Sequence, residues 1–237
     1  MITQHEFSSK GPRASNQDYV VVDELPSRGF FASVADGVGG NRGGEIAAKT
    51  ASMAVVAALK EGVGDFDECF RVADAKLKEL SQNDPALASM ATTLTCILIS
   101  QLRLTGAHVG DCRVYILRRN GIRQLTEDHT EAAKLVRAGS LQKHEAYSHP
   151  YRNLLYSALG SAKNLIVEPF TFDLLPKDRI LLMSDGVYSV VSKRTFRDIS
   201  VTNPDFQSFF DSVLASIEAR KPNDNFSIVA LEVTGRS

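Results

Sequence analysis

The alternation of apolar and polar positions along the chain predicts many short β-strands and a smaller number of amphipathic helices. The apolar runs are rich in β-branched and aromatic residues and are bounded by glycine, proline or polar residues, as is typical of strands. Between two of these runs, Asn120-Gly121 is a strong signal for a hairpin turn. The predicted strands cover residues 18–23, 29–35, 92–100, 105–109, 112–118, 122–125, 166–173, 178–184 and 225–233.

Helical periodicity occurs in segments that separate these strands into groups. Because most strands are joined by tight turns rather than by alternating helices, the pattern favours a layered α+β fold with antiparallel sheets over a doubly wound parallel sheet. Residues 130–153 are polar and long for a connection, which is typical of a lid. No repeat or linker is found, so residues 1–237 are expected to form one domain. The predicted helices cover residues 44–61, 66–82, 130–138, 193–199 and 205–219.

Composition and charge exclude several classes of protein. The hydrophobic content of 43% is ordinary for a globular protein, and 27 Lys and Arg against 28 Asp and Glu give no indication of a nucleic-acid partner. The N-terminus lacks the apolar region of a signal peptide, and no apolar run is long enough to span a membrane, so a cytoplasmic protein is expected. Because the cysteines form no CxxC pair, we interpret them as reduced, small apolar residues; they are Cys69, Cys96 and Cys112.

Acidic residues stand at the ends of several predicted strands: Asp18, Asp36, Asp111, Asp185 and Asp224. If neighbouring antiparallel strands bring these ends to one edge, the carboxylates converge and raise one another's pKa unless a cation is bound. Ligands that are all oxygen select a hard divalent ion, Mg²⁺ or Mn²⁺. Gly37 leaves room for a hydrated metal and can offer its backbone carbonyl. For any single Asp-Gly pair, ordinary turn chemistry is the alternative interpretation.

An anionic ligand is suggested by Arg13, which precedes Asp18 in the stretch RASNQD. In a short loop its planar guanidinium could face the same edge and bind a phosphate through two hydrogen bonds. A solvated surface arginine is the alternative. The glycine-rich stretch 37–45 matches neither a P-loop nor a dinucleotide-binding motif, so we interpret it as room for metal and substrate.

The stretches that carry these residues, taken in order, resemble the motifs of the metal-dependent protein phosphatase family, type 2C. The stretches are RASNQD (13–18), VADGVGG (34–40), HVGDCRVYIL (108–117), LTEDHT (125–130), LLMSDGV (181–187) and DNFSIV (224–229). The resemblance implies a four-layer α/β/β/α sandwich of two antiparallel sheets flanked by helices. Residues 130–153 resemble the flap of bacterial members and are called the flap below; a flap is expected to influence which phosphopeptides fit.

The resemblance also implies the roles of the site residues. Asp36 would bridge two Mg²⁺ or Mn²⁺ ions, with the Gly37 carbonyl on one of them, and Arg13 would bind the substrate phosphate. A water between the two cations would attack phosphorus directly, which makes Arg13 and Asp36 the expected catalytic residues. Asp18, Asp185 and Asp224 would complete the centre. Asp111 would hold a third, weaker metal together with Asp185.

The implied function is hydrolysis of phosphoserine and phosphothreonine in proteins by a short, soluble bacterial phosphatase that opposes a Ser/Thr kinase. The expected partners are phosphorylated proteins and a cognate kinase, without nucleic acid or membrane, and the expected form is a monomer. Some relatives are linked to type VI secretion. Two other interpretations stay open: a catalytically weak regulator that binds phosphoproteins, and a metal-dependent phosphodiesterase. Phosphothreonine peptides and a diester, assayed side by side, would separate these functions.

The sequence departs from the family pattern at four positions outside the expected metal ligands, one of which is Ala91 in place of the usual glycine before Thr92. Val38 stands where some members carry a histidine, so that candidate general acid is missing. Ser157, in the stretch YSALG, replaces an arginine. Cys112 replaces the usual serine beside Asp111, which suggests either a redox switch or a small buried residue.

Overall fold

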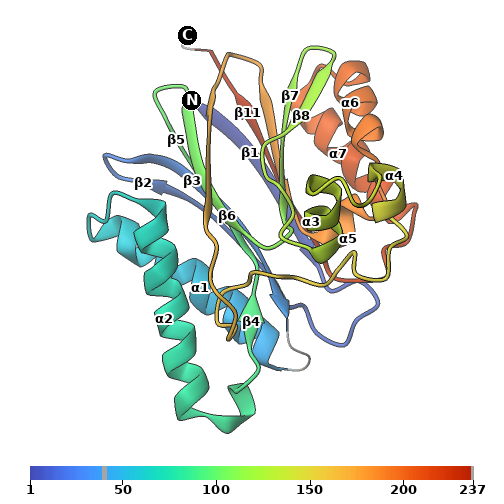
Figure 1. Cartoon of the computed structure of the whole chain (residues 1–237). Helices are drawn as coiled ribbons and strands as arrows, with labels where there is room; N and C mark the ends of the chain where they lie inside the picture. Colours follow the sequence, from blue (N-terminus) through green and yellow to red (C-terminus); the bar gives the residue numbers. More distant parts are fainter. Residues whose placement is uncertain (39–41, 236–237) are drawn as a thin grey trace.

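The computed structural model describes residues 1–38 and 42–235 and shows two antiparallel β-sheets packed face to face (Figure 1). One sheet has the strand order β1-β11-β10-β7-β8 and the other β2-β3-β5-β6-β9, with β4 paired to β3. The first sheet contains β1 (Ile2–Ser9), β11 (Phe226–Val233), β10 (Arg179–Met183), β7 (Arg113–Arg118) and β8 (Gly121–Gln124). The second contains β2 (Asp18–Leu25), β3 (Gly29–Val38), β4 (Ala91–Thr92), β5 (Leu94–Ser100), β6 (Arg103–Val109) and β9 (Glu168–Asp173).

Helices cover the outer face of each sheet, which completes the predicted α/β/β/α sandwich (Figure 1). The helices α1 (Arg42–Lys60) and α2 (Phe66–Asn83) pack on the sheet that contains β3, and α6 (Lys193–Thr202) and α7 (Phe206–Glu218) pack on the sheet that contains β10. Shorter helices lie in the connections: η1 (Pro85–Leu87), α3 (Glu131–Arg137), α4 (Lys143–Ala146) and α5 (Asp185–Tyr188). No described helix is long and apolar enough to cross a lipid bilayer.

Strand alternation divides the core into three apolar layers. In β3, Ala32 and Val34 face the other sheet, whereas Phe31 and Ala35 face α1 and α2. In the same way β7 sends Val114 to the layer between the sheets and Tyr115 to the α6–α7 layer. Both faces of these central strands are therefore buried, which explains why their sequences are nearly continuous apolar runs rather than alternating ones.

The main correction to the predicted elements is the strand β1, which the sequence did not reveal. It pairs with β11 over its whole length, from Ile2 opposite Val233 to Ser9 opposite Phe226. Its own residues are mostly polar and only half-buried or exposed, because it forms the edge of its sheet. Apolar periodicity therefore does not detect it.

Smaller corrections concern three predicted boundaries. The strand predicted at 92–100 is divided into β4 and β5 at Thr93, whose backbone N–H donates to the Asp36 carbonyl (2.9 Å). The predicted hairpin joins β7 and β8, but its turn is Arg119-Asn120, because Gly121 already pairs with Arg118. The flap contains the predicted first helix, as α3, and a second one, α4.

Candidate functional site

The structure brings the five predicted acids to one edge of the sandwich. Asp18 and Asp36 are opposite each other as Cα partners in the β2–β3 pair. Asp185 is the first residue of α5, directly after β10, Asp224 lies just before β11, and Asp111 lies in the turn between β6 and β7. Each of the other four acids raises the pKa of Asp36 electrostatically, as expected for carboxylates gathered in one site.

The electrostatics of this edge are unfavourable for carboxylates alone. Burial raises the pKa of Asp36 well above its ordinary value, and the neighbouring carboxylates raise it further. Burial also raises the pKa of Asp18 to about 7, although a hydrogen bond from Ser184 opposes this shift. The pKa of Asp111 rises to about 8, again mainly through burial and then through Asp185. At neutral pH the site therefore favours either bound protons or a bound cation.

The donor atoms of the site fit a hard, hydrated divalent cation. One oxygen of Asp18, Oδ2, accepts a hydrogen bond from Ser184 Oγ (2.6 Å). The other, Oδ1, is buried and has no hydrogen-bond partner within the described part of the chain. Among residues 1–38 and 42–235, no three His, Cys, Asp or Glu side chains are arranged so that they could hold a metal ion together. Mg²⁺ keeps several waters and uses few carboxylates, so a site for this ion needs fewer protein ligands.

Hydrogen bonds from Thr92 in β4 and from Thr93, between β4 and β5, hold the backbone of Asp36 in place. Thr93 Oγ1 accepts from the Asp36 N–H (2.9 Å), and Thr92 Oγ1 donates to the Asp36 carbonyl (2.9 Å). The Gly37 N–H donates to the Gln17 carbonyl (3.1 Å). A Cβ at Gly37 would overlap the backbone of Gly44 in the first turn of α1. Glycine is therefore required at 37 for this close approach, a reason that the sequence did not reveal; residues 39–41 of the predicted glycine-rich stretch lie outside the described residues.

Arg13 reaches the same edge from the loop between β1 and β2. Its Nη2 donates to Asp224 Oδ2 (2.7 Å), and both side chains remain partly exposed, at 56% and 38%. Burial and the charge of Asp224 raise the pKa of Asp185, and the positive charge of Arg13 partly opposes this shift. An exposed guanidinium beside the acids is placed to meet an anion that arrives from solvent.

Asn225 fixes the loop that carries Arg13, a role that was missed in the sequence. Its Oδ1 accepts from the Gln17 N–H (2.9 Å), and its Nδ2 donates to the carbonyls of Lys10 (2.8 Å) and Ser15 (2.9 Å). One buried amide thus connects the beginning of β11 to the loop before β2. Its position beside Asp224 in the stretch DNFSIV was the available signal.

Two buried histidines support the turn that carries Asp111. The ring nitrogen Nδ1 of His129 accepts from the backbone N–H of Gly110 (3.2 Å). The backbone N–H of His129 donates to the Gly110 carbonyl (2.7 Å). The His108 ring lies 4.8 Å from the His129 ring, and burial lowers the pKa of His108 to about 3. Burial also lowers the pKa of His129, although its partner Glu168 (3.2 Å) opposes this shift, so both rings are neutral near pH 7.

Three of the departures from the family pattern have different structural settings. Val38 is 41% exposed and lies on the same face of β3 as Asp36, since alternate strand residues share a face. Ser157 is buried and its Oγ accepts from the Ile166 N–H (3.0 Å), so it stabilises the local backbone conformation. Cys112 is fully buried, and burial raises the pKa of its thiol well above the ordinary value, which favours a packing role over a redox switch.

Comparison with known proteins gives a consistent result. The family model described as Protein phosphatase 2C matches residues 10–228. The serine/threonine phosphatase stp of Listeria welshimeri is 29% identical over 229 residues, which cover 93% of this chain and 91% of that protein. Protein phosphatase PhpP of Streptococcus pneumoniae is 33% identical over 195 residues, 79% of each chain. The solved catalytic domain of serine/threonine protein phosphatase PstP, in complex with 2 manganese ions, has a TM-score of 0.83, 27% identity and 99% coverage of both chains.

Proposed function

Since the chain belongs to the protein phosphatase 2C family, we propose that it is a metal-dependent phosphatase that hydrolyses phosphoserine and phosphothreonine in proteins. The similarity to phosphatases of Listeria and Streptococcus over most of their length supports this activity. The observation that carries the proposal is the direct opposition of Asp18 and Asp36 at an edge where three more carboxylates meet. Divalent cations would neutralise the repulsion among these carboxylates.

The residues of this edge would hold two Mg²⁺ or Mn²⁺ ions. By position in the family motifs, the ligands would be Asp36, shared by the two ions, together with the Gly37 carbonyl, Asp18, Asp185 and Asp224. Asp111, together with Asp185, would hold a weaker third ion. The manganese-bound structure of PstP supports the choice of cation. When bound, such cations supply a water nucleophile at neutral pH and neutralise charge on the phosphoryl oxygens.

Other side chains bind the phosphate and position the carboxylates. Arg13 leaves Asp224 and binds two phosphoryl oxygens, which orients phosphorus toward the acids and neutralises charge as it develops. Ser184 keeps Oδ2 of Asp18 occupied and leaves Oδ1 for a cation. Thr92 and Thr93 fix the backbone of Asp36, so that its carboxylate does not shift during the reaction.

Val38 supplies no proton to the departing serine or threonine oxygen, although it lies on the same strand face as Asp36. Leaving-group protonation therefore falls to solvent or to another group. This property should make natural phosphoesters slower substrates than aryl phosphates, whose leaving groups depart without a proton.

The substrates would be phosphorylated proteins, with a cognate Ser/Thr kinase as the opposing enzyme. We further propose that residues 1–237 act as one catalytic domain, as a monomer in the cytoplasm. Phosphoproteomics of a strain that lacks the gene would identify the substrates, and sites that gain phosphate would point to the kinase.

The decisive experiment compares a phosphothreonine peptide with a phosphodiester, with and without metal. We expect peptide hydrolysis to disappear on chelation and to return on adding Mn²⁺ or Mg²⁺, with little diester hydrolysis. Full activity of metal-free protein would overturn the metal-centre proposal. Preferential diester hydrolysis would favour the phosphodiesterase, and metal-loaded protein that binds the peptide without hydrolysing it would favour the regulator.

A further inference from the structure

The buried ring of His129 contacts two partners of different kinds. Its Nδ1 accepts from the backbone N–H of Gly110 (3.2 Å). Its Nε2 lies 3.2 Å from Oε2 of Glu168, the first residue of β9. Glu168 lies outside the stretches that resemble the family motifs, and the proposed chemistry gives it no role.

These two contacts determine which ring nitrogen of His129 carries the proton. A neutral imidazole has one N–H, and the nitrogen that accepts a hydrogen bond does not carry it. Because Nδ1 accepts from Gly110, the proton lies on Nε2 and is donated to the Glu168 carboxylate. The carboxylate therefore favours the tautomer that leaves Nδ1 free to bind Gly110.

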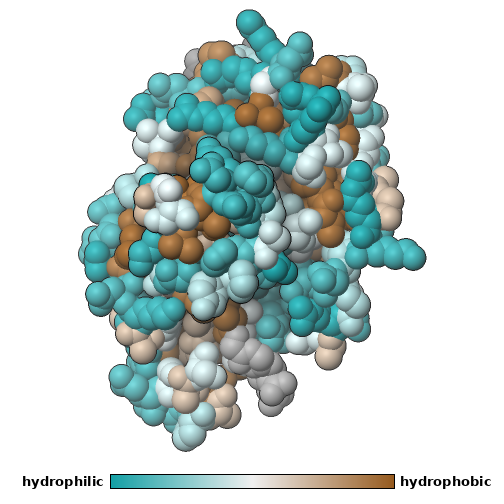
Figure 2. Space-filling view, turned by 45° about the vertical axis from the view of Figure 1, so that its right-hand side comes forward, coloured by the Kyte–Doolittle hydropathy of each residue, from teal (hydrophilic) through white to brown (hydrophobic). Residues whose placement is uncertain are grey.

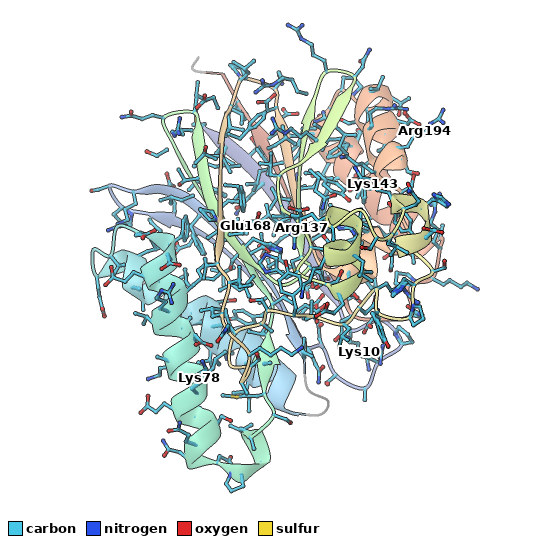
Figure 3. All side chains as sticks on the ribbon, in the orientation of Figure 1. Lys10, Lys78, Arg137, Lys143, Glu168 and Arg194 are labelled. Atoms are coloured by element: carbon cyan, nitrogen blue, oxygen red, sulfur yellow. The ribbon has the colours of Figure 1, made fainter. Side chains whose placement is uncertain are left out.

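Two neighbouring aromatic rings restrict the His129 ring further. The Tyr156 ring stacks on it with the centroids 5.3 Å apart, and the His108 ring lies 4.8 Å away. Arg137 in the flap donates to the Tyr156 hydroxyl (2.8 Å). In Figure 3, Glu168 and Arg137 lie next to each other near the centre of the view, and both act electrostatically on His129. A ring enclosed in this way turns little, so its two hydrogen bonds keep their directions.

His129 holds the two peptide groups that flank Gly110, directly before Asp111. Its ring binds the N–H of Gly110, and its backbone N–H donates to the Gly110 carbonyl (2.7 Å). Gly110 has a φ of +106°, and a Cβ there would overlap the Thr93 side chain, so the turn depends on glycine. With both peptide groups held, the backbone direction at Asp111 is set. The buried Asp111 carboxylate is thus directed by contacts that begin at Glu168.

The ordinary alternative is that Glu168 is a solvated surface acid. Figure 2 shows that the face with the flap is covered mainly by hydrophilic side chains, with separate apolar patches, and an exposed ion pair on such a face contributes little. The contact with His129 is of another kind, because the His129 side chain is only 1% exposed, whereas that of Glu168 is 40% exposed. A buried N–H needs an acceptor, and solvent barely reaches this ring.

We propose that Glu168 is a positioning residue of the phosphatase site, which acts through His129 on the turn that carries Asp111. This inference rests on the proposed function, in which Asp111 holds a cation together with Asp185. Without the Glu168 carboxylate, the His129 ring would lose one of its two hydrogen bonds, and the Gly110 N–H would be held less firmly. Loss of a residue that orients a metal site from behind its ligands typically lowers metal affinity or activity about 10-fold to 100-fold.

The first test measures hydrolysis of a phosphothreonine peptide by the Mn²⁺-loaded full chain. Glu168→Ala should lower kcat about 10-fold and leave KM nearly unchanged, because it displaces Asp111 and leaves the phosphate contact of Arg13 in place. Glu168→Gln keeps an oxygen that can accept from Nε2 of the ring and should restore most of the loss. Asp173→Ala, at the other end of β9 and 84% exposed, is the matched control and should change neither constant.

The second test measures hydrogen exchange of the Gly110 amide by NMR in the Mg²⁺-loaded full chain, a readout that does not require activity. Glu168→Ala should accelerate exchange of this amide about 10-fold, while the amides of β7 keep their rates. A variant that is merely less stable would accelerate both. Glu168→Gln should again lie close to the wild type.

Substitution of His129 shows whether Glu168 acts through it. In His129→Asn, the amide oxygen takes the place of Nδ1 and can still accept from Gly110, but the shorter side chain does not reach Glu168. Glu168→Ala should therefore have no further effect on kcat or on Gly110 exchange in this background. Thermal unfolding identifies a misfolded double variant, and the comparison of Glu168→Ala with Glu168→Gln then decides.

The positioning role would be overturned if wild type hydrolyses the peptide and Glu168→Ala changes neither kcat nor Gly110 exchange. Equal effects of Glu168→Ala with and without His129→Asn would also overturn it, because Glu168 would then act independently of the ring. A wild type that hydrolyses no phosphopeptide would overturn the proposed function and the catalytic part of this inference. Exchange of the Gly110 amide would still decide whether Glu168 holds the turn.

Discussion

Asp18 and Asp36 face each other as Cα partners in neighbouring antiparallel strands, although both are acids. Like charges in this arrangement destabilise a sheet. Burial increases the electrostatic cost of this pair, because Oδ1 of Asp18 lacks a hydrogen-bond partner within the described residues. The cost arises at the edge where the proposed cations would bind.

Stability of the metal-free protein should depend on pH in a direction opposite to that of most carboxylate-rich proteins. The pKa values of Asp18 and Asp111 rise to about 7 and about 8 on folding, so the folded state binds protons more tightly. Their stabilising contribution is complete below about pH 4 and is lost as pH rises through about 7 to 8. We expect the Tm of metal-free protein to fall as the pH rises from about 4 to about 8.

Saturating Mn²⁺ should flatten this dependence, because a cation replaces the protons. The measurement is thermal unfolding over pH with chelator and with Mn²⁺. A metal-free Tm that rises between about pH 5 and about pH 8 would contradict the raised pKa values.

Substitution Asp36→Asn should separate catalysis from stability. Loss of the bridging charge should lower phosphopeptide hydrolysis by several orders of magnitude and weaken metal binding. The metal-free variant should nevertheless unfold at a higher temperature than metal-free wild type near pH 8, because repulsion with Asp18 is removed. Asp173→Asn is a matched control, since Asp173 is an 84% exposed acid on β9. Crystals of Asp36→Asn with both metals at full occupancy would contradict the bridging role.

Arg13→Ala should weaken phosphate binding without unfolding the chain, since the Arg13 side chain is 56% exposed. An increased KM with unchanged kcat would mean that the contact is equal in the ground and transition states, whereas a decreased kcat would mean that it strengthens during transfer. Arg103→Ala is the control, because Arg103 forms a similarly exposed pair with Asp173 (2.9 Å). Unchanged kinetics in Arg13→Ala would remove this residue from the site.

Val38→His should partly restore a proton donor on the strand face of Asp36. We expect kcat on a phosphothreonine peptide to rise relative to p-nitrophenyl phosphate, up to about 100-fold, because only the alkoxide needs a proton. The kcat of the variant should also gain a pH dependence near the ordinary histidine pKa of about 6.5.

The control for this substitution is Val38→Gln, which adds a polar side chain without an ionisable proton. If the ratio of kcat on the peptide to kcat on p-nitrophenyl phosphate were equal in the two variants, the imidazole would not be acting as an acid. Selective loss of peptide hydrolysis in His144→Ala or His149→Ala, with p-nitrophenyl phosphate spared, would show that a flap histidine already donates the proton.

The sequence by itself determined the central strands, the main helices and the position of each acid relative to a strand end. These features depend on local patterns: apolar runs for β3 and β10, helical periodicity for α1 and α7, and an acid beside each run. The order of the motifs also indicated the layered sandwich. The edge strand β1 was not predicted, since its half-exposed residues form no apolar pattern.

Only the tertiary structure decided which of these residues meet. The β2–β3 register places Asp18 opposite Asp36, and a shift of one residue would turn one carboxylate away from the other. Asn225 reaches the N–H of Gln17, 208 positions away along the chain. Such contacts depend on register and on packing between distant segments, and no local stretch of sequence specifies either.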